Sequence, residues 1–183
     1  MRRMLVALIF CLLFAGCSRA SEDAGSMAAY EGYYKAIQDN DRFQERSLYY
    51  SLSGELVTLS DRTHRYYVFL DDAQIAMYDV VLLAVENHTA YEDADHMMPS
   101  IGVFESTEYS LIPYQSRADA GFVKGLVLSG ECDSDEVELD LLVEWRDKNK
   151  ENAHREYLEL TLTKDGFLYT EEEVEDAEEQ LDE

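Results

Sequence analysis

Residues 136–162, EVELDLLVEWRDKNKENAHREYLELTL, decide the fold. Acidic and apolar side chains alternate over 136–141 and apolar residues continue to Trp145, so this segment has the pattern of a strand with one wet and one dry face. The alternation returns in 155–162, after a polar segment at 147–153. The sequence therefore predicts two antiparallel strands joined by a polar loop.

The rest of the chain contains more segments of this kind. The run 80–85, VVLLAV, fits either a strand buried on both faces or a short helix, and its neighbours favour a strand. Short segments rich in aromatic and β-branched residues stand at 48–52, 56–59, 65–70, 74–85, 101–105, 109–114 and 121–128. Regular short strands with few helices predict a mostly β fold, an antiparallel β-sandwich. The immunoglobulin-like group is its obvious architecture, with Trp145 as a core aromatic, although the disulfide of that group is missing.

One helix is expected, before the strands. Met27, Tyr30, Tyr34 and Ile37 recur at three- to four-residue spacing, which places them on one face of an amphipathic helix. Ser26 is a suitable N-cap. We expect this helix to pack an aromatic stripe on a single domain that covers 26–170, because neither an internal repeat nor a second linker is visible.

The chain begins MRRMLVALIFCLLFAGC, with two arginines, an apolar run of eleven and a small pair before Cys17. This is the order of a secretory signal segment, and the run is shorter than the roughly 20 residues that span a bilayer. Leu13–Cys17 resembles the lipobox of bacterial lipoproteins. That resemblance implies removal of residues 1–16 and lipidation of Cys17, while a plain signal peptide or an uncleaved anchor stays open as the alternative.

A lipidated Cys17 would make the lipid bilayer the first partner of the chain, since two acyl chains hold a protein stably on a membrane. The expected location is the outer face of the cell membrane, or the outer membrane in a Gram-negative host. Residues 17–25 are small and polar, which predicts a flexible tether.

Charge and cysteine usage exclude several classes of protein. The formal net charge is −24, so nucleic acid is a poor partner. Residues 171–183 carry nine acids and no base, which predicts a disordered acidic tail, with a capped helix or a docking segment as alternatives. Cys132 is the one thiol left in the body, so no internal disulfide is expected. Its acidic neighbours are expected to raise the thiol pKa.

One patch has the ligand types of a metal site. His96, Met97 and Met98 follow two aspartates, and thioether with imidazole suits copper(I). The favoured interpretation is a loop or short helix whose methionines fill the core, so no metal site is assigned. Residues 133–136 bring carboxylates together but lack the glycine of a calcium loop, and we predict a hairpin turn there.

Catalytic and cofactor motifs are not found. The four histidines are scattered, and neither an HExxH pair, a GxSxG elbow nor a glycine-rich phosphate loop occurs. Thirteen tyrosines include the doublets 33–34, 49–50 and 66–67. Exposed tyrosines are common in recognition surfaces, although tyrosine also simply suits half-buried sheet positions, which is the favoured interpretation.

A second resemblance extends over most of the body. RYYVFLDDAQIAMYDVVLLAVEN (65–87), MMPSIGVFES (97–106), PYQS (113–116) and GFVKGL (121–126) together resemble small uncharacterised lipoproteins of gut Firmicutes. This resemblance implies a surface location and a one-domain body, and no activity. The leading hypothesis is a tethered, non-catalytic module that binds an envelope protein or glycan. An envelope metal or solute carrier that uses His96, Met97 and Met98 is second, and a small envelope hydrolase is third.

Overall fold

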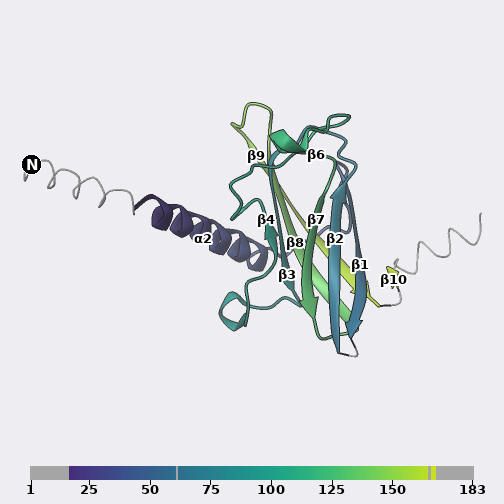
Figure 1. Ribbon diagram of the computed structural model, residues 1–183. Coiled ribbons are helices and arrows are strands. Elements are labelled where there is room, and N and C mark those ends of the chain that lie inside the picture. The colour runs from purple at the N-terminus through teal and green to yellow at the C-terminus, as the bar shows by residue number, and fades with distance from the viewer. Residues whose placement is uncertain (1–16, 61, 165, 168–183) are drawn as a thin grey trace, which may run out of the picture.

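Two β-sheets lie face to face in the computed structural model, with one helix leaving the side of the sandwich (Figure 1). The structure describes residues 17–60, 62–164, 166 and 167, so the expected signal segment and acidic tail lie outside the described residues. The elements are α2 (Cys17–Gln38), β1 (Ser51–Ser60), β2 (Thr63–Asp71), β3 (Tyr78–Glu86), η1 (Tyr91–Asp93), β4 (Ser100–Ile101), β5 (Ser110–Leu111), η2 (Ala118–Ala120), β6 (Phe122–Val123), β7 (Leu126–Cys132), β8 (Glu136–Arg146), β9 (Ala153–Thr163) and β10 (Gly166–Phe167).

The strand order is β1-β2-β7 in one sheet and β10-β9-β8-β3-β4 in the other. All pairs within these two sheets are antiparallel, whereas β5 and β6 form a small parallel pair. The predicted mostly β, antiparallel sandwich is therefore confirmed. The order of pairing corresponds to strands A-B-E against C-F-G of an immunoglobulin-like sandwich, with β4 beside the C position.

The main core lies between the two sheets. Strand β2 alternates buried and half-buried positions and turns Tyr66, Val68 and Leu70 inward. Strands β3 and β8 of the facing sheet contribute the other side of this core. Trp145 on β8 is buried in it, as predicted for a core aromatic. The run 80–85 is a strand, buried along its whole length, as the sequence favours.

A second core lies on the other face of the larger sheet, under α2. Tyr30, Tyr34 and Ile37 are buried there against Leu83 and Leu142. The predicted stripe is thus confirmed for Tyr30, Tyr34 and Ile37, whereas Met27 of the same predicted face is exposed. The wet face predicted for strand 136–145 is wrong at Asp140 and Leu142, which are buried, while Glu136 is exposed and Glu138 and Glu144 are half-buried.

The helix itself begins earlier than expected. It runs from Cys17, nine residues before the expected N-cap Ser26, so the residues 17–25 that were predicted as a flexible tether are helical. Ala and Glu occur among these residues and favour helix, and a helix already held by its aromatic stripe can be extended one residue at a time at little cost.

Several strand boundaries also differ from the sequence pattern. Segments 48–52 and 56–59 belong largely to one strand, β1, while 101–105 and 109–114 shrink to the two-residue β4 and β5. The hairpin turn predicted at 133–136 is wrong, because β7 and β8 belong to different sheets and this segment crosses between them. Partners far along the chain decide strand pairing, which explains why local pattern misplaced these ends.

Candidate functional site

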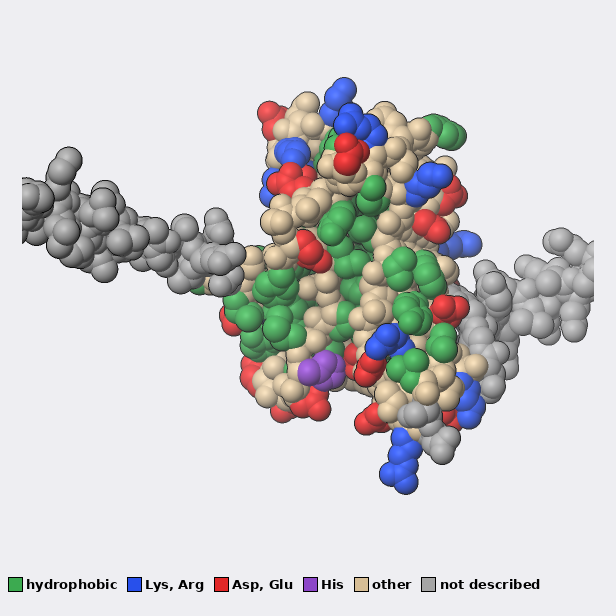
Figure 2. Space-filling view, in the orientation of Figure 1, with side chains coloured by type: hydrophobic (Ala, Val, Ile, Leu, Met, Phe, Trp, Pro, Cys, Tyr) green, Lys and Arg blue, Asp and Glu red, His purple; other side chains and the backbone are tan. Residues whose placement is uncertain are grey.

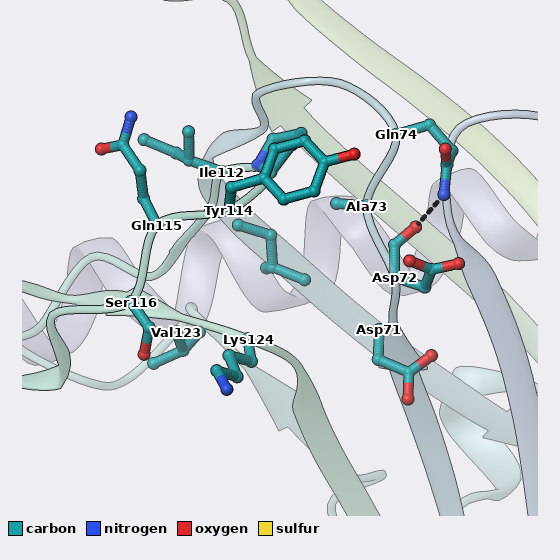
Figure 3. A pocket seen from close by; sticks show the side chains of 12 residues that line it. Asp71, Asp72, Ala73, Gln74, Ile112, Tyr114, Gln115, Ser116, Val123 and Lys124 are labelled. Atoms are coloured by element: carbon teal, nitrogen blue, oxygen red, sulfur yellow. Dashed lines mark hydrogen bonds between the residues drawn. The ribbon is translucent and has the colours of Figure 1, made fainter.

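A cavity of about 640 Å³ opens at one end of the sandwich. Three segments line it: 71–74, from the end of β2 into the following loop; 111–116, from the end of β5 onward; and 123–124, at the end of β6 (Figure 3). Its floor is rigid, because the buried Leu111 and Met77 exchange two backbone hydrogen bonds of 2.9 and 2.8 Å. The cavity thus combines a fixed base with loop walls.

The first wall is a tight turn that carries Tyr114. The amide of Gln115 donates to the carbonyl oxygen of Ile112 over 3.0 Å, and Pro113 fixes a negative φ at the second position of the turn. Tyr114 follows with φ of 63°, so this is a type II turn in which tyrosine occupies the position that favours glycine. Its side chain is fully exposed. The conformation costs roughly 1 kcal/mol, and the ring adds nothing to the core.

The second wall is strained as well. Asp72 has φ of 46°, and its carbonyl oxygen accepts a hydrogen bond from the side-chain amide of Gln74 over 2.8 Å. The backbone amide of Gln74 donates to the carbonyl oxygen of Tyr49, which holds the loop against the start of β1. Within the described part of the chain, the carboxylates of Asp71 and Asp72 have no hydrogen-bond or ion-pair partner. Both are therefore available to a ligand.

The third wall depends on a glycine. Gly125 stands opposite Asp71, and a Cβ atom added to it would lie 2.9 Å from the Cβ of Asp71 and 2.9 Å from the carbonyl oxygen of Leu70. Glycine therefore lets the chain before β7 approach the end of β2 closely. This approach brings Lys124 into the same cavity as Asp71 (Figure 3).

The groups that line this cavity suit binding. Tyr114 offers an aromatic face, Asp71 and Asp72 offer acceptors, and Gln115 and Ser116 offer both donors and acceptors. In Figure 3 the ring of Tyr114 extends over the cavity, toward the wall that carries Ala73 and Asp72. Polar groups around an apolar base are typical of a ligand pocket. In Figure 3 the amide of Gln115 and the carboxylates of Asp71 and Asp72 extend from opposite walls, away from one another.

The residues of the weak metal candidate differ in burial, although His96 and Met97 line one pocket beside α2. Met98 is 3% exposed and packs under α2, where its amide donates to the Tyr30 hydroxyl over 2.8 Å. Met97 is 52% exposed at the surface. The Nδ1 atom of His96 is 2.5 Å from the carboxylate of Asp95, and its Nε2 atom is 3.8 Å from the carboxylate of Glu86. Among the residues that the structure describes, no group of three or more His, Cys, Asp or Glu side chains could hold a metal ion.

Of the carboxylates at 133–136, Asp135 is paired within the protein. Asp135 pairs with Lys164 over 2.6 Å and with the buried His64 over 3.1 Å. Next to them, the pKa of the Cys132 thiol is raised, as predicted. Burial is the main cause, and the charges of Glu86 and Asp133 add to it.

His88, which follows the end of β3, lies between two carboxylates of β8. The Nδ1 atom of His88 is 2.6 Å from the carboxylate of Asp140, and its Nε2 is 3.1 Å from Glu138. The hydrogen bond with Asp140 raises the pKa of His88, while burial raises the pKa of Asp140. Asp140 lies on β8 and is buried, which sequence alternation did not predict.

An aromatic strip runs over the outer face of the smaller sheet. Tyr67 and Phe69 stack with ring centroids 6.4 Å apart, and Val57, Leu59 and Val127 on the neighbouring strands are partly exposed. Figure 2 shows hydrophobic side chains gathered over these strands. In the doublet 66–67 on β2 the first ring is buried and the second is half-buried, as alternation on a strand requires. The doublet 49–50 lies before β1, where Tyr50 is buried and Tyr49 is exposed.

Sequence reasoning missed the Tyr114 cavity. The one local signal was Pro113 followed by a residue other than glycine, in a turn between apolar segments. No family model, curated protein or solved structure matches the chain in the three comparisons that were made. Among the helices of the described residues, none is both long and apolar enough to cross a membrane.

Proposed function

We propose that this chain is a lipid-anchored, non-catalytic binding module at the outer face of the cell membrane, and that it binds its ligand in the Tyr114 cavity. The observation that carries the proposal is the strained, fully exposed Tyr114 above a cavity of about 640 Å³. A glycine would satisfy the turn without strain, so the aromatic ring is best explained by a ligand.

The anchor rests on the chain before the fold. Arg2 and Arg3, the apolar run and the order Leu13 to Cys17 fit a lipoprotein signal, and two acyl chains on Cys17 would hold the body at the membrane. The negative net charge supports a lipid anchor over a basic membrane patch, since anionic headgroups repel an acidic body.

The placement of α2 is compatible with this function. The helix leaves the side of the sandwich, where it packs on β3 and β8, whereas the loops around β6 and η2 lie at one end (Figure 1). An anchor reached through α2 therefore leaves the mouth of the cavity open.

Two measurements test the proposal. In the first, cells that express the full chain or its Cys17→Ser variant are fractionated, and the amount of protein in the membrane fraction is compared. The mass of the membrane-bound protein is determined by intact mass spectrometry. We expect acylation of the wild type and release of the variant from the membrane fraction. Equal retention of both proteins would contradict the anchor.

Binding is tested on isolated cell envelopes from the host, with the solubilised full chain added over a range of concentrations. We expect saturable binding that Tyr114→Ala weakens about tenfold or more, a loss of roughly 1.4 kcal/mol. The matched control is Met97→Ala, another exposed apolar side chain, which lies near α2 and lines a different pocket. Equal losses in both variants, or hydrolysis of an envelope polymer by the pure protein, would contradict a binding module of this kind.

A further inference from the structure

We infer that the Tyr114 cavity takes a neutral saccharide, with one sugar ring on the face of Tyr114 and its hydroxyl groups on Asp71, Asp72 and Gln115. This inference rests on the proposed function and names the ligand class of the same site. It follows from the shape of the ring platform, the types of polar group around it and the charge of the site.

The first argument is the exposed ring. A pyranose has a face of C–H bonds, and this face packs on the π-face of an aromatic side chain. Tyrosine provides such a platform with little loss of conformational entropy because it has two side-chain torsions. Tyr114 has no ring partner among the aromatic pairs of the described residues, so its ring is not committed to the fold.

The second argument is the set of polar groups. Sugar hydroxyls donate and accept at once, and neighbouring hydroxyls pair well with planar groups such as carboxylates and amides. Asp71 and Asp72 belong to one wall of the cavity, and Gln115 and Ser116 belong to the other (Figure 3).

The third argument is charge. Two free carboxylates and one lysine leave the cavity negative, and the chain carries −24 in total, so phosphorylated and other anionic ligands are disfavoured. A basic peptide is the strongest rival, because this charge would attract it. Lys124 lies in the same cavity and opposes a second cation close to Asp71, whereas a neutral sugar meets no such penalty.

The experiment is isothermal titration of the full-length chain, in a detergent without sugar groups, against two sets of probes. The first set is soluble cello-, chito-, laminari- and manno-oligosaccharides, and the second is oligolysine and an alternating Lys-Gly peptide. We expect at least one saccharide to bind, with an affinity that changes less than twofold between about 0.05 and 0.5 M salt, since no ion pair is screened.

Three variants complete the test. Tyr114→Ala should weaken saccharide binding about tenfold or more, and Tyr114→Phe should retain it because the ring face is kept. Asp71→Asn should weaken binding severalfold, since a neutral amide accepts hydrogen bonds less strongly than a carboxylate. Met97→Ala should bind like the wild type.

The outcomes separate the two proposals. Salt-sensitive binding of the basic peptides that Tyr114→Ala removes would overturn the saccharide inference and leave the binding module intact. If no probe binds and envelope binding is also indifferent to Tyr114→Ala, both proposals are wrong. Saccharide binding that Tyr114→Ala does not affect would place the ligand elsewhere and overturn this inference alone.

Discussion

The hydroxyl of Tyr66 on β2 donates a hydrogen bond of 2.6 Å to the carboxylate of Glu86 at the end of β3, and so joins the two sheets through their interior. Both side chains are buried. Gly130 on β7 stands opposite Tyr66, and a Cβ atom there would collide with the tyrosine ring and hydroxyl. One tyrosine, one acid and one glycine thus form a single packing unit at this end of the sandwich.

Removal of this hydrogen bond should destabilise the fold. In Tyr66→Phe, a buried carboxylate loses its donor, which costs about 1–3 kcal/mol. The measurement is the free energy of unfolding from urea denaturation. Tyr67→Phe is the matched control, because its hydroxyl lies on the outer face of the same strand, and we expect a change within about 0.5 kcal/mol. Equal effects of the two substitutions would show that the hydrogen bond to Glu86 does not contribute.

The sequence predicted most of the sandwich because the information for it is local. The alternation in 136–162 became β8 and β9, paired residue for residue from Glu136 with Thr163 to Arg146 with Ala153. Asp140 has the same local pattern as an exposed strand residue. It is buried because of the segments that cover this sheet face, and a pattern of period two does not contain that information.

The candidate site could not be predicted from local sequence patterns, because it too depends on segments far apart in the chain. Its three walls come from 71–74, 111–116 and 123–124, and only the pairing of β2 with β7 and the bridge from Met77 to Leu111 bring them together. The sequence contains thirteen tyrosines, and Tyr114 differs from the others in its backbone conformation and its full exposure, which a local pattern does not reveal. His96, Met97 and Met98, which adjoin in sequence, have different burial.

A helix substitution should stabilise the protein. Gly32 lies in α2 on the exposed side, and nothing lies within 4 Å of a Cβ atom added to it. Gly32→Ala therefore keeps all contacts and gains helix propensity, up to about 1 kcal/mol. Thermal unfolding measures the gain. Gly102→Ala is the opposite control, because Gly102 has φ of 81° and its added Cβ would meet the carbonyl oxygen of Val80. A loss of stability in Gly32→Ala would contradict the exposed placement of this helix face.

Stability should fall as the pH rises through the pKa of folded His88. Asp140 raises the pKa of His88 above its ordinary value of about 6.5. A raised histidine pKa contributes stability that is fully present below pH 6.5 and is lost as the pH rises through the folded-state pKa. Between about pH 5.5 and 8, the melting temperature of His88→Gln should therefore decline less than that of the wild type.

The control for this pH profile is His154→Gln. His154 stacks on Trp145 at 5.6 Å between ring centroids and has no hydrogen-bond or ion-pair partner within the described ranges. It serves as the matched histidine substitution in the same measurement. If His154→Gln flattens the slope as much as His88→Gln, the pairing of His88 with Asp140 is not the cause.

The strain at Tyr114 makes a prediction that does not require the ligand to be known. Tyr114→Gly should relieve about 1 kcal/mol of backbone strain in the absence of ligand, because glycine adopts φ of 63° without a steric penalty. The gain is reduced by the greater entropy of glycine in the unfolded chain, so Tyr114→Asn serves as a second variant with a smaller entropic term. Tyr114→Phe keeps both the ring and the strain and should have the stability of the wild type.

The same Gly and Asn variants should bind envelopes about tenfold more weakly or worse. A protein that becomes more stable and loses binding through one exposed side chain has retained that side chain for its ligand, whereas a loss of stability in both Gly and Asn variants would show that the ring supports the fold.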